Sequence, residues 1–121
     1  MKVKPRDPVA ITIVASRDPG IDLDKPIFTL SVASEILEVH PRTLMMYEHL
    51  SMINPKRTLT NRRRYSRRDV LKLQAIQTLT REHHVNLAGV RHILALLKRL
   101  QNAGVEAPED LKHLDVSLLD V

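Results

Sequence analysis

The sequence predicts a mainly α-helical protein, and three observations lead to this prediction. The chain has 121 residues, 43% of them hydrophobic, which is enough for one domain and an appendage. Phe28, Tyr47 and Tyr65 are its only Phe and Tyr residues and it has no Trp, so aliphatic side chains and Met must build the core. Such a core favours helices over a sandwich or barrel. In several segments apolar residues also recur at helical spacing.

Residues 1–25 are expected to form a flexible N-terminal arm. Residues that interrupt helices are spread along and just beyond it: Pro5, Pro8, Pro19, Gly20 and Pro26. Residues 9–14 have strand propensity, so an edge strand is the alternative for that segment. The apolar run fits a signal peptide poorly, and the chain lacks a run of about eighteen apolar residues. We therefore expect a cytoplasmic location and no membrane span.

Two short helices joined by a tight turn are predicted after a strand at residues 27–30. Ser31 is expected to cap the first helix through its hydroxyl, and Glu35 is expected to add favourable charge to the first turn. Pro41 suits the first position of the second helix, which is expected to run to residue 49 or 50. The first helix is predicted to bury one stripe, formed by Val32, Ala33, Ile36 and Leu37.

The second helix is expected to bury Leu44 and Tyr47, which lie three residues apart on one side. A basic hairpin is predicted next, with arms at residues 56–57 and 62–65. Its tip spans residues 58–61, where Asn61 can take a left-handed conformation.

Two longer helices complete the prediction. Ser66 and Asp69 resemble a capping box at the start of the third helix, which is expected to end near residue 83. Asn86 is expected to cap the fourth helix and Gly104 to end it. The apolar stripe of the fourth helix consists of Leu87, Val90, Ile93, Leu94, Leu97 and Leu100. A short helix is expected from residue 108 to about residue 114.

Basic residues are concentrated in one part of the chain. The net charge is +5 and the pI about 9.9, which suits a polyanionic partner. Only Asp69 opposes eight basic residues between positions 56 and 72, whereas the chain beyond residue 100 is mainly acidic. The eight are Lys56, Arg57, Arg62, Arg63, Arg64, Arg67, Arg68 and Lys72.

The sequence predicts neither a metal site nor an enzyme. It has no cysteine, and the adjacent residues His83 and His84 do not share a helical face. No carboxylate or cysteine cluster surrounds them in the sequence, so we interpret them as histidines at a helix end. No glycine-rich phosphate loop and no nucleophile–base pair is recognisable, and no cofactor is expected.

A set of short motifs lies in one order and spacing over residues 26–97. It consists of Thr43-Leu44, Tyr47-Glu48, Leu50-x-x-Ile53-x-Pro55-x-Arg57, Arg63-x-Tyr65-Ser66-x-x-Asp69 and residues 85–90. With these motifs the chain resembles the MerR family of transcriptional regulators, and within it the HspR-type heat-shock repressors. The resemblance implies a winged helix-turn-helix DNA-binding domain at residues 26–85, with a short β wing. It also implies a dimerisation helix and short tail at residues 86–121.

The chain departs from the family pattern at two places. The second helix of the family usually reads Thr-Leu-Arg-x-Tyr, but Met45 stands here where that pattern has Arg. A methionine cannot donate a hydrogen bond to a phosphate or to guanine, so a customary polar contact is missing. The helical periodicity also stops at Gly104, where family members commonly continue a long dimerisation helix.

The basic cluster and the resemblance together predict a DNA interface. Arg42, Thr43 and Met46 are expected near base edges, with Met46 against a thymine methyl group. Tyr47 and Tyr65 are expected mainly to pack, with their hydroxyls near a phosphate. The remaining candidates are wing residues expected at phosphates: Lys56, Arg57, Arg62, Arg63 and Arg64. Alternate residues of a strand face opposite ways, so Arg62, Arg63 and Arg64 cannot all reach DNA at once.

The resulting prediction is a sequence-specific transcriptional regulator, and more specifically a repressor. It would bind a near-palindromic operator in double-stranded DNA as a homodimer. The resemblance implies control of heat-shock or chaperone genes, with a DnaK-type chaperone as corepressor. The alternatives are a protein-interaction module of the same fold and a nucleoid-type DNA binder of low selectivity.

Overall fold

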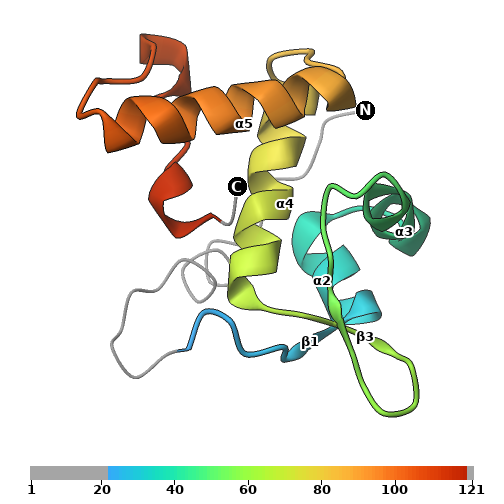
Figure 1. The fold of residues 1–121 in the computed structure, drawn as a ribbon. Helices are drawn as coiled ribbons and strands as arrows, with labels where there is room; N and C mark the ends of the chain where they lie inside the picture. Colours follow the sequence, from blue (N-terminus) through green and yellow to red (C-terminus); the bar gives the residue numbers. More distant parts are fainter. Residues whose placement is uncertain (1–21, 120–121) are drawn as a thin grey trace. The chain divides into compact units, whose positions relative to one another are not determined.

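Helices dominate the part of the chain that the structure, a computed structural model, describes, namely residues 22–119 (Figure 1). The predicted arm lies outside these residues except for its last four positions, and so does the strand alternative at residues 9–14. The observed α-helices and strands are β1 (Phe28–Thr29), α2 (Leu30–Leu37), α3 (Pro41–His49), β2 (Lys56–Arg57), β3 (Arg63–Tyr65), α4 (Arg67–Arg81) and α5 (Leu87–Asn102). The 3-10 helices η1 (Glu109–Leu111) and η2 (Val116–Leu118) follow. The mainly helical prediction is confirmed.

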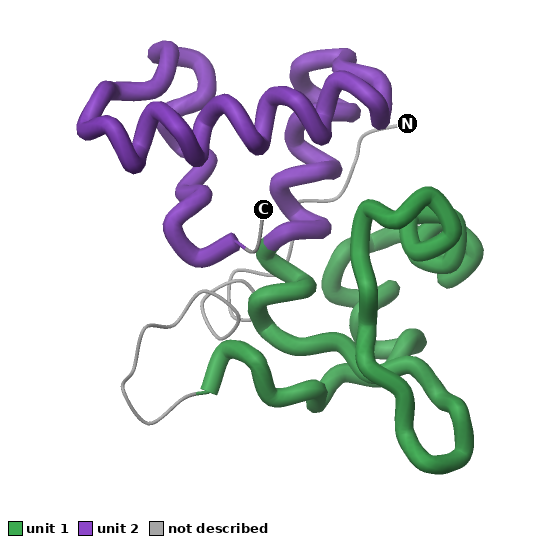
Figure 2. The backbone as a smooth tube through the Cα atoms, in the orientation of Figure 1, with its two compact units in different colours: residues 1–71 green, residues 72–121 purple. Residues whose placement is uncertain are grey.

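The chain divides into two compact units, residues 1–71 and residues 72–121 (Figure 2). We refer to them as unit 1 and unit 2. The boundary falls inside α4, so this helix begins in unit 1 and ends in unit 2. Among residues 22–119, no helix is both long enough and apolar enough to cross a membrane.

In unit 1, helix α2 begins earlier than the sequence indicated. Thr29 is its N-cap, and the Thr29 hydroxyl accepts a hydrogen bond from the Val32 amide at 3.1 Å. The prediction that Ser31 caps this helix is therefore wrong. Glu35 consequently lies beyond the first turn, which contains no acidic residue.

The shifted start of α2 also changes which of its residues are buried. Ala33, Ser34 and Leu37 face the core, whereas Val32 is 42% exposed, contrary to prediction. The buried Ser34 hydroxyl is satisfied because it donates to the Leu30 carbonyl at 2.7 Å.

A tight turn connects α2 to α3. Glu38 ends α2 in a left-handed conformation (φ 54°), and its amide donates to the carbonyls of Glu35 and Ser34. The predicted bounds of α3 are confirmed, with Pro41 in its first turn. The ring nitrogen Nδ1 of His40 accepts a hydrogen bond from the Arg42 amide at 3.0 Å and so caps α3.

The core of unit 1 is formed by α2, α3, the segment that follows α3, the end of the wing and the first turn of α4. Its buried apolar residues are Ala33, Leu37, Leu44, Tyr47, Met52, Ile53, Tyr65 and Val70. The prediction that Leu44 and Tyr47 share one buried side of α3 is thus confirmed. The opposite side of α3 is left for the surface.

The strands of unit 1 form a three-stranded antiparallel sheet in the order β1-β3-β2. Strands β2 and β3 are the arms of the predicted wing, with Lys56 opposite Arg64 and Arg57 opposite Arg63. At the tip Asn61 has φ 62°, the left-handed conformation expected from the sequence. Strand β1 pairs with β3 and places Phe28 opposite Tyr65, which fixes the wing against the start of α2.

Helices α4 and α5 begin at the predicted caps. The Ser66 hydroxyl accepts from the Asp69 amide and an Asp69 carboxylate oxygen accepts from the Ser66 amide, both at 3.0 Å. In unit 2, the Asn86 side chain accepts from the Gly89 amide at 2.8 Å. Helix α5 buries Val90, Leu94 and Leu97 and packs against η2. Two 3-10 helices replace the single short helix expected near residue 108.

Candidate nucleic-acid interface

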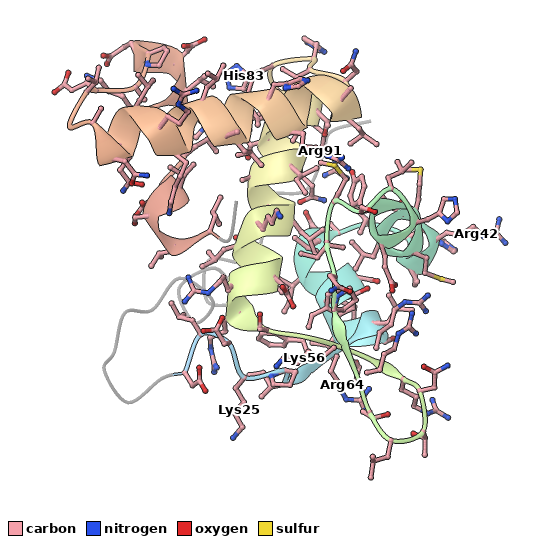
Figure 3. The ribbon with its side chains drawn as sticks, in the orientation of Figure 1. Lys25, Arg42, Lys56, Arg64, His83 and Arg91 are labelled. Atoms are coloured by element: carbon pink, nitrogen blue, oxygen red, sulfur yellow. The ribbon has the colours of Figure 1, made fainter. Side chains whose placement is uncertain are left out.

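The exposed side of α3 carries one cation and two methionines. Arg42 extends outward from the first turn of the helix (Figure 3), and Thr43 beside it is partly exposed. Met45 is 40% exposed and Met46 is 45% exposed. These side chains are free to meet a ligand because Leu44 and Tyr47 attach the helix to the core by its other side.

The wing presents its cations on two opposite faces. Alternate residues of a strand point to opposite sides, so Arg57 and Arg63 share one face and Lys56 and Arg64 share the other. Arg57 and Arg63 point toward α3, where both contact Glu48. The Arg64 guanidinium donates to the Arg63 carbonyl at 3.0 Å. The expectation that neighbouring arginines of the wing face different ways agrees with this arrangement.

Glu48 joins the wing to α3 through two ion pairs. Its Oε1 accepts a hydrogen bond from Arg63 Nε at 2.5 Å, and its Oε2 accepts one from Arg57 Nη2 at 2.8 Å. Two guanidinium groups directly opposite each other on adjacent strands repel, and one carboxylate between them removes that repulsion. Glu48 therefore ties both arms of the wing to α3, in addition to the pairing of β3 with β1.

The electrostatics of Glu48 follow from this position. Burial alone would raise the pKa of its carboxyl, but hydrogen bonding and charge from Arg63, and then from Arg57, outweigh that effect and lower it below 4.5. Glu48 is therefore a permanent anion at neutral pH.

Tyr65 belongs to the core of unit 1 and not to its surface. The residue is fully buried, and its hydroxyl has no hydrogen-bond partner among the described residues. Burial raises the pKa of this hydroxyl to about 12, so it stays protonated. The packing part of the role expected for Tyr65 thus agrees with the structure, whereas its hydroxyl is not directed to the surface. Tyr47, 7% exposed, is likewise mainly a packing residue.

A hollow of about 430 Å³ opens between the wing and the starts of the two helices. Its lining comes from the first residues of α2, from Pro41 at the start of α3 and from the second arm of the wing. The lining residues are Thr29, Leu30, Ser31, Pro41, Asn61, Arg62, Arg63 and Arg64. The start of α2 and the three arginine side chains of the lining both favour an anion, so the hollow has the chemistry of a phosphate site.

The predicted cations differ in how free they are. Among the described residues Arg42 and Arg62 are exposed and have no ion pair, whereas Arg57 and Arg63 share Glu48. Other members of the basic cluster are engaged elsewhere in unit 1. Arg68 pairs with Asp24 at 2.7 Å, and the guanidinium of Arg67 lies 5.9 Å from the centre of the Phe28 ring.

Glu48 is a residue of the candidate interface that the predicted site did not include. In the sequence it lies 15 positions before Arg63, and nothing local indicates that the two meet. One signal was nevertheless available, because Glu48 follows Tyr47 in one of the recognisable motifs and precedes a strongly basic segment.

A helical pair with an exposed second helix, followed by a basic two-stranded wing, defines a winged helix-turn-helix protein. Residues 28–105 match the family described as MerR HTH family regulatory protein, and the chain belongs to this family. Members of the family bind DNA. The resemblance predicted from the motifs is confirmed.

Three relatives extend the comparison. The chain is 36% identical over 92 residues to a Streptomyces coelicolor protein named heat shock protein HspR, covering 76% of this chain and 61% of that protein. It is 32% identical over 89 residues to the HTH-type transcriptional regulator GlnR of Bacillus anthracis and to that of Bacillus cereus, covering 74% of this chain and 67% of each relative. The chain therefore spans less than two thirds of the HspR relative. The regulator names agree with the prediction that the chain is not an enzyme.

Proposed function

We propose that this chain is a sequence-specific transcriptional repressor that binds a near-palindromic operator in double-stranded DNA as a homodimer. The observation that carries the proposal is the surface of unit 1 on which the exposed side of α3 and the wing are joined by Glu48. In a winged helix-turn-helix protein the second helix enters the major groove, and the wing lies on the neighbouring backbone.

Arg42, Thr43 and Met46 are the proposed contacts to base edges. Residues near the N-terminus of a recognition helix approach the bases, and Arg42 is exposed there. An arginine can donate two hydrogen bonds to guanine, and a methionine can pack against a thymine methyl group. Each good pairing contributes about 1–3 kcal/mol of discrimination.

The wing supplies the proposed phosphate contacts. Arg62 lies beside the hollow at the helix starts, and a phosphate there would also meet the first amides of α2. Arg57 and Arg63 remain partly exposed while paired with Glu48, so a phosphate can approach them without displacing the carboxylate. Lys56 and Arg64 are the proposed phosphate contacts on the other face of the wing.

The gene class and partner rest on the named relative. One relative is named heat shock protein HspR, which supports control of heat-shock or chaperone genes. The same resemblance suggests a DnaK-type chaperone as corepressor and a cytoplasmic, nucleoid-associated location. DNA footprinting at chaperone promoters, with and without added chaperone, tests the gene class and the corepressor. Identical footprints in both conditions would argue against the corepressor.

Selection of bound duplexes from a random DNA pool, followed by sequencing, tests the proposed function. We expect an enriched motif with two half-sites related by a near two-fold axis, as a homodimer requires. The variant Arg42→Ala should lose preference at defined positions of each half-site. The matched control Arg81→Ala removes an exposed arginine from unit 2 and should recover the wild-type motif. A pool without enrichment would contradict sequence-specific binding.

One observation favours a second candidate, a DNA binder of low selectivity. Met45 is exposed on α3 where the family pattern has Arg, so one polar base or phosphate contact is absent. Competition with random-sequence duplex separates the two functions. A selective regulator keeps its operator under a large excess of competitor, whereas a nucleoid-type binder loses it in proportion to the excess.

A further inference from the structure

The turn after α4 and the segment after η1 bring two imidazoles and two carboxylates together in unit 2. Glu82 and His83 follow the last residue of α4, and His113 follows η1. One donor atom from each of these three residues lies within 4.8 Å of the others. Asp110 of η1 is adjacent, with its Oδ2 4.0 Å from Nδ1 of His83. His83 is labelled in Figure 3.

The fold removes the objection that the sequence raised against a metal. Residues 82 and 83 lie beyond the end of α4, so the rule that adjacent residues do not share a helical face no longer applies to them. The partner of His83 is His113, thirty positions away, and not His84. The carboxylates that were not recognised as a cluster in the sequence come from Glu82 and from Asp110.

The geometry of the donors is close to that of a metal site. Nε2 of His113 is 4.0 Å from Oε2 of Glu82, and the two imidazole rings lie 6.0 Å apart at 23°. Ligands of a tetrahedral zinc ion lie about 3.3 Å from one another, given bond lengths of about 2.0 Å. Donor atoms that lie 4.0 to 4.8 Å apart would have to approach by about 0.7 to 1.5 Å, and rotation of the exposed Glu82 and His113 side chains can supply this movement.

The donor set also selects the kind of ion. Two imidazole nitrogens with carboxylate oxygens suit Zn²⁺ and neighbouring first-row divalent ions, whereas Ca²⁺ and Mg²⁺ prefer oxygen ligands alone. His83 is largely covered, with 22% of its side chain exposed, while Glu82 and His113 are open to solvent. An ion could thus enter from the surface without rearrangement of the core.

We propose that Glu82, His83 and His113 form a binding site for Zn²⁺, with Asp110 or a water molecule as the fourth ligand. The ion would tie the segment after η1 to the α4–α5 turn. Asp110 and His113 lie beyond the residues that match the family, so the site is a feature of this chain and not part of the family match. The proposal is independent of DNA binding.

Titration of the tag-free, full-length protein with zinc chloride by isothermal calorimetry, after dialysis against chelator, tests the proposal. We expect saturation at one ion per chain and a Tm that rises with the concentration of free zinc. The double variant His83→Ala/His113→Ala should bind about tenfold more weakly or worse. Substitution of Co²⁺ should give the intense visible absorption of a four-coordinate ion, and the double variant should lose it.

The matched control His84→Ala/His92→Ala also removes two imidazoles, both from exposed positions outside the cluster. It should bind zinc as the wild type does. If both double variants lose affinity equally, or the wild type does not saturate, the proposal is overturned. If His83→Ala/His113→Ala loses its helical circular dichroism, zinc affinity is measured on Glu82→Gln instead. Unchanged affinity in that folded variant overturns the proposal in the same way.

Discussion

Glu48 shows how one side chain can set the direction of two others. Without it, Arg57 and Arg63 would stand opposite each other on β2 and β3 and repel. With it, both are drawn toward α3 by hydrogen bonds of 2.8 Å and 2.5 Å. Glu48 is not expected to touch DNA. It nevertheless positions the wing relative to α3, and both of these elements are expected to contact DNA.

The variant Glu48→Gln should reduce the selectivity of DNA binding. A neutral amide cannot hold two guanidinium groups, so the wing would no longer be fixed to α3 and both arginines would be free for any phosphate. We expect tighter binding to random duplex and a ratio of operator to random affinity about tenfold lower.

Fluorescence anisotropy with both duplexes measures that ratio. Glu35→Gln is the control, because it makes the same change of charge at an exposed position on α2 of unit 1. An unchanged ratio in Glu48→Gln would mean that the ion pairs do not position the wing.

The same carboxylate should contribute to acid sensitivity. Its pKa in the folded protein lies below the ordinary value of 4.5, so its stabilising contribution is complete above pH 4.5 and is lost as the pH falls through the lower, folded value. Urea denaturation at a series of acidic pH values should show wild type losing more stability below pH 4.5 than Glu48→Gln. Parallel losses would show that the ion pairs add nothing to stability.

Removal of the Tyr65 hydroxyl should stabilise the protein. The hydroxyl is buried and has no partner among the described residues, so Tyr65→Phe should raise the free energy of unfolding by about 1 kcal/mol. DNA affinity should stay at the wild-type value, because the group does not reach the surface. A loss of affinity without loss of stability would instead restore the phosphate contact expected from the sequence.

At the scale of elements, the sequence was informative where the signal is local. The bounds of α3 followed from Pro41 and from the spacing of Leu44 and Tyr47. The caps of α4 and α5 followed from residues three positions apart, Ser66 with Asp69 and Asn86 with Gly89. In these cases the residues that form the hydrogen bond are neighbours in the chain, so no knowledge of the fold was needed.

Long-range pairing explains what the sequence did not reveal. Thr29 and Ser31 both fit the rule for a helix cap, and the choice depends on where β1 ends. That end is set by the last pair of the two strands, Thr29 with Arg64, which lies far along the chain. The Glu48 bridge and the His83–His113 cluster were missed for the same reason, since each unites residues from separate elements.

The position of the α2 cap can be tested with a matched pair of variants. Thr29→Val keeps the shape and strand propensity of the side chain but removes the hydroxyl that accepts from the Val32 amide. It should cost about 1 kcal/mol of stability. Ser31→Ala, at an exposed position inside the helix, should change stability by less than about 0.5 kcal/mol. Chemical denaturation measures both, and the reverse order would assign the cap to Ser31.

At the scale of the whole molecule, the charge of the chain is not spread evenly. Unit 1 carries the exposed cations Arg42 and Arg62 without an ion pair among its described residues. The described end of unit 2 instead has acidic side chains, two of which pair with Lys112 at 3.4 Å and 2.9 Å. An overall charge of +5 therefore understates how strongly one part of the chain attracts a polyanion.

The salt dependence of binding reports both the contacts and the number of chains on the DNA. Each phosphate contact contributes about −0.9 to the slope of log affinity against log salt concentration. If Arg42 and Arg62 each neutralise one phosphate, the double variant Arg42→Ala/Arg62→Ala should flatten the slope by about 3.6 for a dimer, but only by about 1.8 for a monomer. Anisotropy titrations over a range of salt concentrations measure the slope, and ultracentrifugation checks the oligomeric state of each variant.

The control Arg81→Ala/Arg99→Ala removes the same amount of charge from unit 2 and should leave the slope unchanged. Equal flattening by both double variants would indicate a diffuse effect of net charge, and the interface on α3 and the wing would lose its support.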